Sequence, residues 1–176
     1  IIQCKMDTRF RYSWMKFIMN KLIQACAFIL ADHGFDTMRL LTFQVMQAGA
    51  TDYYHTHLHI PTGNIHQDQT PEDALYESIY RRTGIPKANL DLVRKIGISS
   101  RYRMTIDTTF IRHEYVLELT TPYPETWKQA YQRSMNDSED LKIQMITPAQ
   151  LPQVNAEYRD IIEKQILEFT LSNSDV

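Results

Sequence analysis

Most of the hydrophobic and polar patterns along the chain predict β-strands. The runs ACAFILAD (25–32) and MRLLTFQVM (38–46) are apolar enough for buried strands, and the turn residues HGFD (33–36) between them predict a hairpin. DYYHTHLHI (52–60) predicts a third strand, which ends at a proline. The first third of the chain is therefore expected to consist largely of strands.

The second half of the chain also has strand patterns. LDLVRKIGIS (90–99) and LKIQMITP (141–148) are apolar segments of strand length, and the polar loop NDSED (136–140) leads into the second of them. In IRHEYVLELT (111–120) apolar and aromatic residues alternate with charged ones. This alternation predicts a half-buried strand.

Three segments have helical spacing. Residues 13–21 predict a short leading helix, and AEYRDIIEKQILEFTL (156–171) outlines an amphipathic helix. The best-marked helix follows Thr70, a natural N-cap, starts at Pro71 with acidic residues in its first turn, and stops at Gly84. Helices that cover a mixed sheet are the economical solution for this order of elements, which predicts an α+β fold.

Size and composition indicate a single globular domain. The chain has 176 residues, of which 43% are hydrophobic and 23% charged, as in soluble globular proteins. Two cysteines without metal spacing or a disulfide framework favour a reducing, cytoplasmic compartment. The apolar run LIQACAFILA (22–31) is too short to span a bilayer, and no membrane association is expected.

Charge is distributed unevenly along the chain. The net charge of −2 gives no general attraction to nucleic acid, so we do not expect nucleic acid as a partner. Residues 81–112, however, hold eight Lys/Arg and two acidic residues, a local balance of +6, whereas residues 113–176 have a balance of −6. Such asymmetry indicates either an anion-facing surface beside an acidic one or two ordinary solvated surfaces.

The segment IPTGNIHQDQTPEDALYESIYRRTGI (60–85), together with the order of elements, resembles the Nudix (MutT-like) hydrolase family. The family motif has a Gly, five residues, Glu, seven residues, and then Arg-Glu-apolar-x-Glu-Glu-x-Gly-apolar. Its scaffold positions fall in register and without a gap on Gly63, Ile79, Gly84 and Ile85.

The resemblance extends from about residue 25 to the C-terminal helix. It implies the Nudix fold, a three-layer α/β/α sandwich with a central mixed β-sheet. On this interpretation residues 1–24 are an N-terminal extension with a short helix, and residues 25–176 form a single Nudix-like domain.

The chemical positions of the motif do not match, so the Nudix box is degenerate. Its first Glu falls on Gln69 and its Arg on Glu77, and the other glutamates fall on Ser78, Arg81 and Arg82. In the family the helix carboxylates hold Mg²⁺ or Mn²⁺, which activates water against a diphosphate. With a hydroxyl and two guanidinium groups in their place, we expect no family-type hydrolysis and no cofactor. Mg²⁺ or Mn²⁺ would be needed only if a hydrolase activity remains.

The replacements could themselves bind a ligand. Guanidinium groups suit bidentate contacts with phosphate. The candidate ligand-binding residues are therefore Arg81 and Arg82, Ser78 on the same helix, and Arg101 and Arg103 in the basic stretch. The alternative is an exposed helix end at which Arg81 forms only a weak surface pair with Glu77.

The HTHLH motif suggests a second site. On a strand His55, His57 and His59 would lie in a row on one face, where they could hold Zn²⁺ or Ni²⁺. His57 and His59 could instead contact a ligand, or all three could form an ordinary polar face. Glu114 is a weak candidate for a general base, by analogy with late carboxylates in Nudix enzymes.

Three functional hypotheses follow. The first is a pseudoenzyme that binds a phosphorylated or nucleotide-like small molecule, or else a protein partner or a second copy of itself. The second is a divergent Nudix hydrolase that cleaves a nucleoside diphosphate-linked substrate with a non-standard metal or ligand set. The third is a structural module of a larger assembly. The reversed charge on the helix favours binding over hydrolysis.

Overall fold

The computed structural model describes residues 20–31, 38–47, 50–132 and 138–167. The predicted turn at 33–36 and residues 13–19 of the predicted leading helix lie outside the described residues. Asn20 and Lys21, the end of that predicted helix, belong to the first strand instead. This strand begins five residues before the predicted start of the domain at Ala25.

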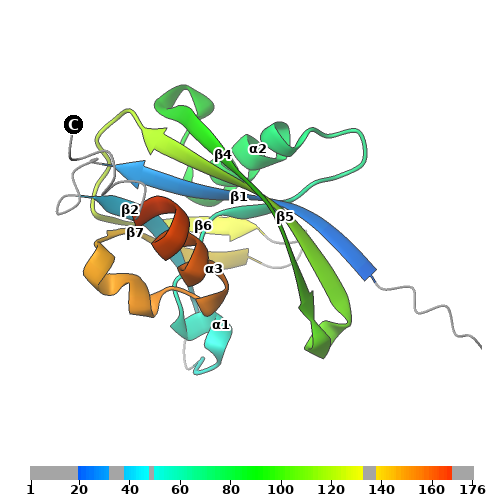
Figure 1. Cartoon of the computed structure of the whole chain (residues 1–176). Helices are drawn as coiled ribbons and strands as arrows, with labels where there is room; N and C mark the ends of the chain where they lie inside the picture. The colour runs from blue at the N-terminus through cyan, green and yellow to red at the C-terminus, as the bar shows by residue number, and fades with distance from the viewer. Residues whose placement is uncertain (1–19, 32–37, 48–49, 133–137, 168–176) are drawn as a thin grey trace, which may run out of the picture.

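The described strands form one mixed, seven-stranded sheet (Figure 1). Its order is β4-β5-β1-β2-β7-β6, and β3 pairs with β1 away from this path. β1 and β5 are parallel, whereas the other pairs are antiparallel. The strands are β1 (Asn20–Ala31), β2 (Arg39–Met46), β3 (Thr62–Asn64), β4 (Leu90–Arg103), β5 (Thr108–Leu119), β6 (Thr126–Gln132) and β7 (Ser138–Ile146).

β1 and β2 separate along most of their length, and we call the gap between them the wedge. The two strands pair only at their hairpin end, at Leu30↔Leu40 and Ala31↔Arg39, and then diverge. β3 enters the wedge and pairs with residues 24–26 of β1, while His59 exchanges both backbone hydrogen bonds with Phe43 of β2. The chain around residues 58–65 therefore lines an opening in the sheet.

The helix α2 (Pro71–Thr83) covers one face of the sheet and forms as predicted. The Thr70 hydroxyl accepts a hydrogen bond from the Asp73 backbone N–H at 3.1 Å, and Gly84 ends the helix in the left-handed region at φ 74°. Its buried residues join one hydrophobic core with residues of β1, β2 and β5. Local signals thus define the helix, and its apolar face attaches it to the sheet.

A second hydrophobic core lies on the opposite face. There the 3₁₀ segment η3 (Pro148–Gln153), the helix α3 (Ala156–Ile161) and the π-helical turn η4 (Ile162–Leu167) pack against β1 and β5 through Tyr158 and Ile162. Shorter 3₁₀ segments precede and follow β4, at η1 (Lys87–Asn89) and η2 (Met104–Ile106). Helices on both faces of a mixed sheet confirm the three-layer α/β/α prediction. None of the helices in these described segments has both the length and the apolar character to cross a membrane.

The predicted strand over 52–60 is wrong. The helix α1 (Tyr53–Thr56) occupies its first half, because the Asp52 carboxylate caps the helix and accepts a hydrogen bond from the His55 N–H at 3.1 Å. Only Leu58 and His59 make isolated β-bridges. A local side-chain cap has overridden the β-propensity of the aromatic residues.

Two further differences concern the second half. β6 has no alternating apolar pattern, and it forms as an edge strand through its pairing with β7. β5 was predicted to be half-buried, but Arg112 and Glu114 are only 5% and 4% exposed because the face that carries them lies under α3. Both differences arise from tertiary packing.

Candidate functional site

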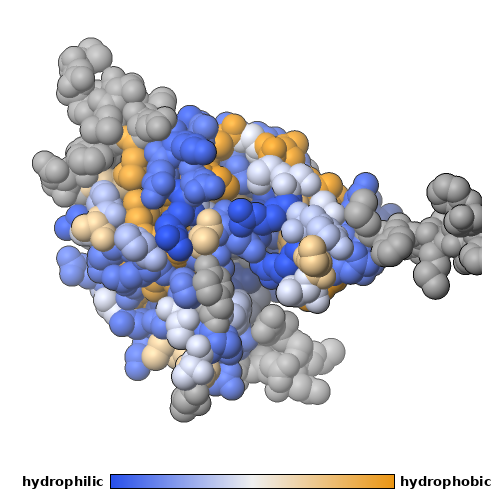
Figure 2. Space-filling view, turned by 60° about the horizontal axis from the view of Figure 1, so that its bottom comes forward, coloured by the Kyte–Doolittle hydropathy of each residue, from blue (hydrophilic) through white to orange (hydrophobic). Residues whose placement is uncertain are grey.

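The wedge contains a cavity of about 940 Å³. Side chains from α2, β1, β3, the β4–β5 hairpin, α1 and α3 line it. In the view of Figure 2, strongly hydrophilic residues gather at the centre of the face that comes forward. The charged lining residues are Arg81, Arg82, Arg103, Arg112, Asp52 and Glu157.

One side of the cavity is formed by Ser78, Arg81 and Arg82, which we call the α2 wall. A Cβ atom at Gly63 would lie 2.4 Å from the Ser78 Cβ, so only glycine allows β3 to approach the helix this closely. Ser78 is buried, and its hydroxyl donates a hydrogen bond to the Leu75 carbonyl at 2.8 Å. The scaffold positions of the motif therefore behave as the resemblance implies, and Ile79 and Ile85 are fully buried.

The two arginines of the α2 wall have different environments. Arg81 forms the predicted pair with Glu77, at 3.3 Å between Nη2 and Oε1, and both side chains are about half exposed. Arg82 stacks over the rings of Phe43 and Tyr131, with 5.0 and 4.7 Å to the centroids. Stacking uses the face of the planar guanidinium group and leaves its N–H edge for hydrogen bonds.

The α2 wall does not fit a divalent metal ion. Mg²⁺ and Mn²⁺ prefer oxygen ligands, above all carboxylates, but this wall has two cations and a hydroxyl whose proton is already donated. Glu77 lies outside the cavity lining and is occupied by Arg81 and by the Gln69 amide, which donates to it at 2.8 Å. Among the described residues no group of three His, Cys, Asp or Glu side chains could hold a metal ion.

The opposite side is formed by Arg103, Arg112 and Glu157, which we call the arm wall. Arg112 Nη2 donates to Glu157 Oε2 at 2.6 Å, and Arg103 Nη2 donates to Glu157 Oε1 at 2.5 Å. Arg112 also donates from Nε to the Gln24 side chain at 3.3 Å. Burial alone would raise the pKa of Glu157, but the hydrogen bonds from the two arginines outweigh it and lower the pKa, so Glu157 is an anion at neutral pH.

Arg112 and Glu157 were not among the predicted site residues. Arg112 belongs to a strand whose alternation placed it on the predicted solvent face, and Glu157 lies in the first turn of a helix, where acidic residues are common. The unequal charge of the two halves of the chain was the one available signal. It gave no indication that these two residues meet.

The three histidines do not form a row. His55 lies on α1 with its Nδ1 atom 2.7 Å from the Asp52 carboxylate, and His57 follows α1 outside the cavity lining. His59 lines the cavity, donates from Nε2 to the Tyr54 carbonyl at 2.7 Å, and stacks on Phe43. Burial lowers the pKa of His59. The linear arrangement required for the metal alternative is absent.

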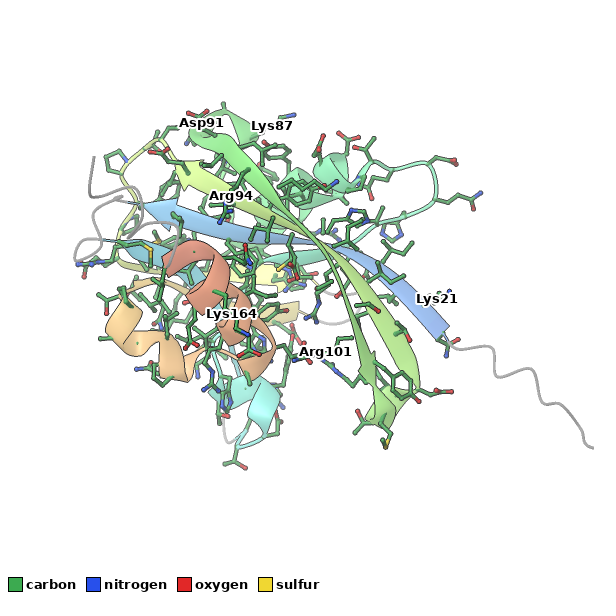
Figure 3. The ribbon with its side chains drawn as sticks, in the orientation of Figure 1. Lys21, Lys87, Asp91, Arg94, Arg101 and Lys164 are labelled. Atoms are coloured by element: carbon green, nitrogen blue, oxygen red, sulfur yellow. The ribbon has the colours of Figure 1, made fainter. Side chains whose placement is uncertain are left out.

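The remaining candidates lie away from the cavity lining. Glu114 is buried under α3 and accepts a hydrogen bond from the Ser99 hydroxyl, so it does not face the opening; burial raises its pKa. Arg101 is exposed on β4, and Figure 3 shows its side chain extending from the strand toward the body of the domain. Of the predicted ligand-binding residues, the cavity brings together Ser78, Arg81, Arg82, His59 and Arg103.

No family model and no curated protein matches the sequence. Among solved structures, the chain is similar to Escherichia coli dihydroneopterin triphosphate pyrophosphohydrolase (TM-score 0.59, 16% identity, covering 83% of this chain and 95% of that one). It is also similar to the Mycobacterium smegmatis Nudix hydrolase RenU (TM-score 0.58, 12% identity, 85% of both chains). A third is the Nudix domain of Shewanella oneidensis NrtR complexed with ADP ribose (TM-score 0.55, 12% identity, 89% of both chains). The chain has the Nudix fold.

Proposed function

We propose that this Nudix-fold chain binds a phosphorylated, nucleotide-like ligand in the cavity and does not catalyse the metal-dependent hydrolysis of the family. The observation that carries the proposal is the composition of the α2 wall. Ser78, Arg81 and Arg82 line the cavity where carboxylates would have to hold a divalent ion. A divalent ion near Arg82 would meet like-charge repulsion of about 1–4 kcal/mol for each unit of charge at a few Å in a surface-like dielectric.

The lining has the properties that a nucleotide-like ligand needs. Four arginines face two carboxylates, and Asp52 is already paired with His55, so the cavity has an excess of positive charge. Guanidinium groups bind phosphate through paired N–H donors. Phe43, Tyr54, Phe110, Tyr131 and Tyr158 also line the cavity and give it an aromatic surface beside the arginines. The complex of the NrtR domain with ADP ribose is a precedent for such a ligand on this fold.

The test is calorimetric titration of the protein with ADP and with ADP ribose in the absence of divalent ions. We expect an R81Q/R82Q double variant to bind about tenfold more weakly, because it loses charge-assisted hydrogen bonds to phosphate. The matched control is K87Q/K164Q, which removes two positive charges from residues outside the cavity lining and should bind like the wild type. Equal affinity in all three proteins would refute the proposal.

A second assay addresses hydrolysis directly. The wild type is incubated with ADP ribose and with diadenosine tetraphosphate in the presence of Mg²⁺, Mn²⁺ or Zn²⁺, and product is followed by chromatography. We expect no turnover above that of the R81Q/R82Q variant. Turnover that depends on the metal and on Glu114 would instead support the divergent-hydrolase alternative.

A further inference from the structure

We infer that a second anion-binding station lies at the edge of the cavity, formed by Arg103 of the lining and its strand neighbour Arg101, and that the ligand carries anionic groups at two separated positions. The inference rests on the proposed function and specifies its ligand. The station lies on the far end of the β4–β5 hairpin, residues 99–110, which we call the β4–β5 arm and which extends beyond the body of the domain (Figure 1).

Strand register places both arginines on the cavity side of the arm. Arg101 is paired with Phe110 and Arg103 with Thr108 in the antiparallel ladder. Cross-strand partners share a face of the sheet, and Phe110 is buried and lines the cavity. Residues two apart on a strand also share a face, so Arg101 and Arg103 both belong to the cavity side. Figure 3 shows the Arg101 side chain extending from the strand toward the body of the domain.

The charges at this station are not balanced. Glu157 is a single carboxylate shared by Arg103 and Arg112, so two guanidinium groups contact one negative charge. Arg101 has no hydrogen-bond or ion-pair partner within the described segments. The nearby carboxylates form no ion pair with Arg101 or Arg103 in the described part of the chain, since Asp107 accepts a hydrogen bond from the Tyr102 hydroxyl and Glu114 accepts one from the Ser99 hydroxyl.

Glu157 holds Arg103 in a fixed position without covering it. The Arg103 guanidinium group donates to Glu157, lies over the Phe110 ring at 5.0 Å, and remains 41% exposed. Thr105 adds a hydroxyl to the same part of the lining. An arginine that is already oriented loses less conformational entropy when it binds an anion, so we assign Glu157 the role of a positioning residue.

The two cationic stations lie on opposite sides of the cavity. Arg82 sits over Phe43 of β2 and Tyr131 of β6, whereas Arg101 and Arg103 are on β4. In the order of the sheet β5, β1 and β3 lie between β4 and β2, so the two stations belong to different parts of the cavity edge. Gln24 and Asn64, which are hydrogen-bonded to each other, lie in the lining between them. This arrangement fits a nucleoside or sugar that has phosphate groups at two ends.

Two isomers provide a sharp test. ADP carries both phosphates at one end of the nucleoside, and adenosine 3′,5′-bisphosphate has the same composition with one phosphate at each of two positions. We expect the wild type to bind the bisphosphate about tenfold more tightly than ADP in calorimetry. In R101Q/R103Q this preference should disappear, with ADP affinity changed by less than about threefold.

Three further variants keep the result interpretable. R101Q alone breaks no contact within the described residues, so it tests the station without disturbing the Glu157 ion pairs, and we expect about threefold loss for the bisphosphate. R101K/R103K should restore part of the preference. K95Q removes a positive charge from the same strand on the opposite face, above Tyr115, and should leave the preference unchanged.

The outcomes separate this inference from the proposed function. Equal binding of the two isomers by the wild type, or a preference that survives in R101Q/R103Q, overturns the second station. If ADP binding still depends on Arg81 and Arg82 in that case, the proposed function stands. If neither isomer binds, both fail.

Discussion

The two walls of the cavity use the same residue type in different ways. On the α2 wall the arginines lie at the end of a single helix, with an exposed carboxylate and two aromatic rings as their neighbours. On the arm wall Arg103 and Arg112 come from two strands, and both donate to Glu157 of α3. One wall is local in sequence and the other joins residues that are 45 and 54 positions apart.

The difference concerns what each wall contributes to the protein. Removing a partner from an exposed pair leaves its charge in water, whereas removing a partner from a buried pair leaves a charge that water cannot reach. Arg112 is 5% exposed, so its ion pair matters to stability, whereas Arg81 is about half exposed and its pair with Glu77 lies in water. We therefore expect the arm wall to contribute both to ligand binding and to the stability of the fold, and the α2 wall to contribute mainly to ligand binding.

The largest effect should come from the E157A substitution. It leaves the buried Arg112 without its carboxylate, and we expect the free energy of unfolding to fall by about 3–5 kcal/mol. The matched substitution, E77A, removes the exposed carboxylate that pairs with Arg81 of the α2 wall and should cost less than about 1 kcal/mol. Urea denaturation of both variants measures the difference; equal losses would show that the two walls are alike.

The next effect concerns the contact of β3 with the α2 wall. In G63A the new methyl group would lie 2.4 Å from the Ser78 Cβ and 3.2 Å from the Ala74 carbonyl oxygen, so the helix must move, at a cost of about 1–3 kcal/mol. G97A is the control, since a Cβ there meets nothing within 4 Å. Its unfolding free energy should stay within about 0.5 kcal/mol of the wild type. A tolerated G63A would contradict the close packing.

A smaller effect distinguishes the two arginines of the α2 wall. R82A loses stacking on Phe43 and Tyr131, and we expect it to lower the unfolding free energy by about 1 kcal/mol. R81A loses only a surface pair and should change it by less than about 0.5 kcal/mol. Thermal unfolding of both single variants would show this order. If R81A lowered the unfolding free energy more than R82A, stacking of Arg82 on the two rings would not be the stabilising contact of this wall.

The smallest effect is a difference in pH dependence. Burial lowers the pKa of His59 below its ordinary 6.5, so its contribution to stability is complete above about pH 6.5 and is lost as the pH falls toward the folded pKa. The arginine hydrogen bonds lower the pKa of Glu157 below its ordinary 4.5, so its contribution is complete above about pH 4.5 and is lost as the pH falls through the folded pKa.

Variants that cannot titrate make this measurable. We expect H59Q to flatten the stability curve in the window that begins near pH 6.5, and E157Q to flatten it only below about pH 4.5. Urea unfolding at intervals of half a pH unit resolves the two windows. Curves that keep the wild-type slope in both variants would mean that these groups titrate alike in the folded and unfolded protein.

Much of the α2 wall could be predicted from the sequence. Thr70, Pro71 and Gly84 define where the helix begins and ends, and the spacing from Gly63 places Ser78, Arg81 and Arg82 on the cavity side. These signals depend on backbone geometry and on contacts within a few residues. The same local reasoning failed for residues 52–60, where the Asp52 cap turned an apparent strand into α1.

The sequence by itself determined the layered fold, the capped helix and the absence of carboxylates from its cavity side, because short-range backbone preferences and side-chain periodicity specify them. Only the tertiary structure decided that Gln24, Arg112 and Glu157 meet, and that Arg103 lines the same cavity. Charge pairing between residues so far apart in the chain depends on how strands and helices pack. No local pattern in the sequence records that packing.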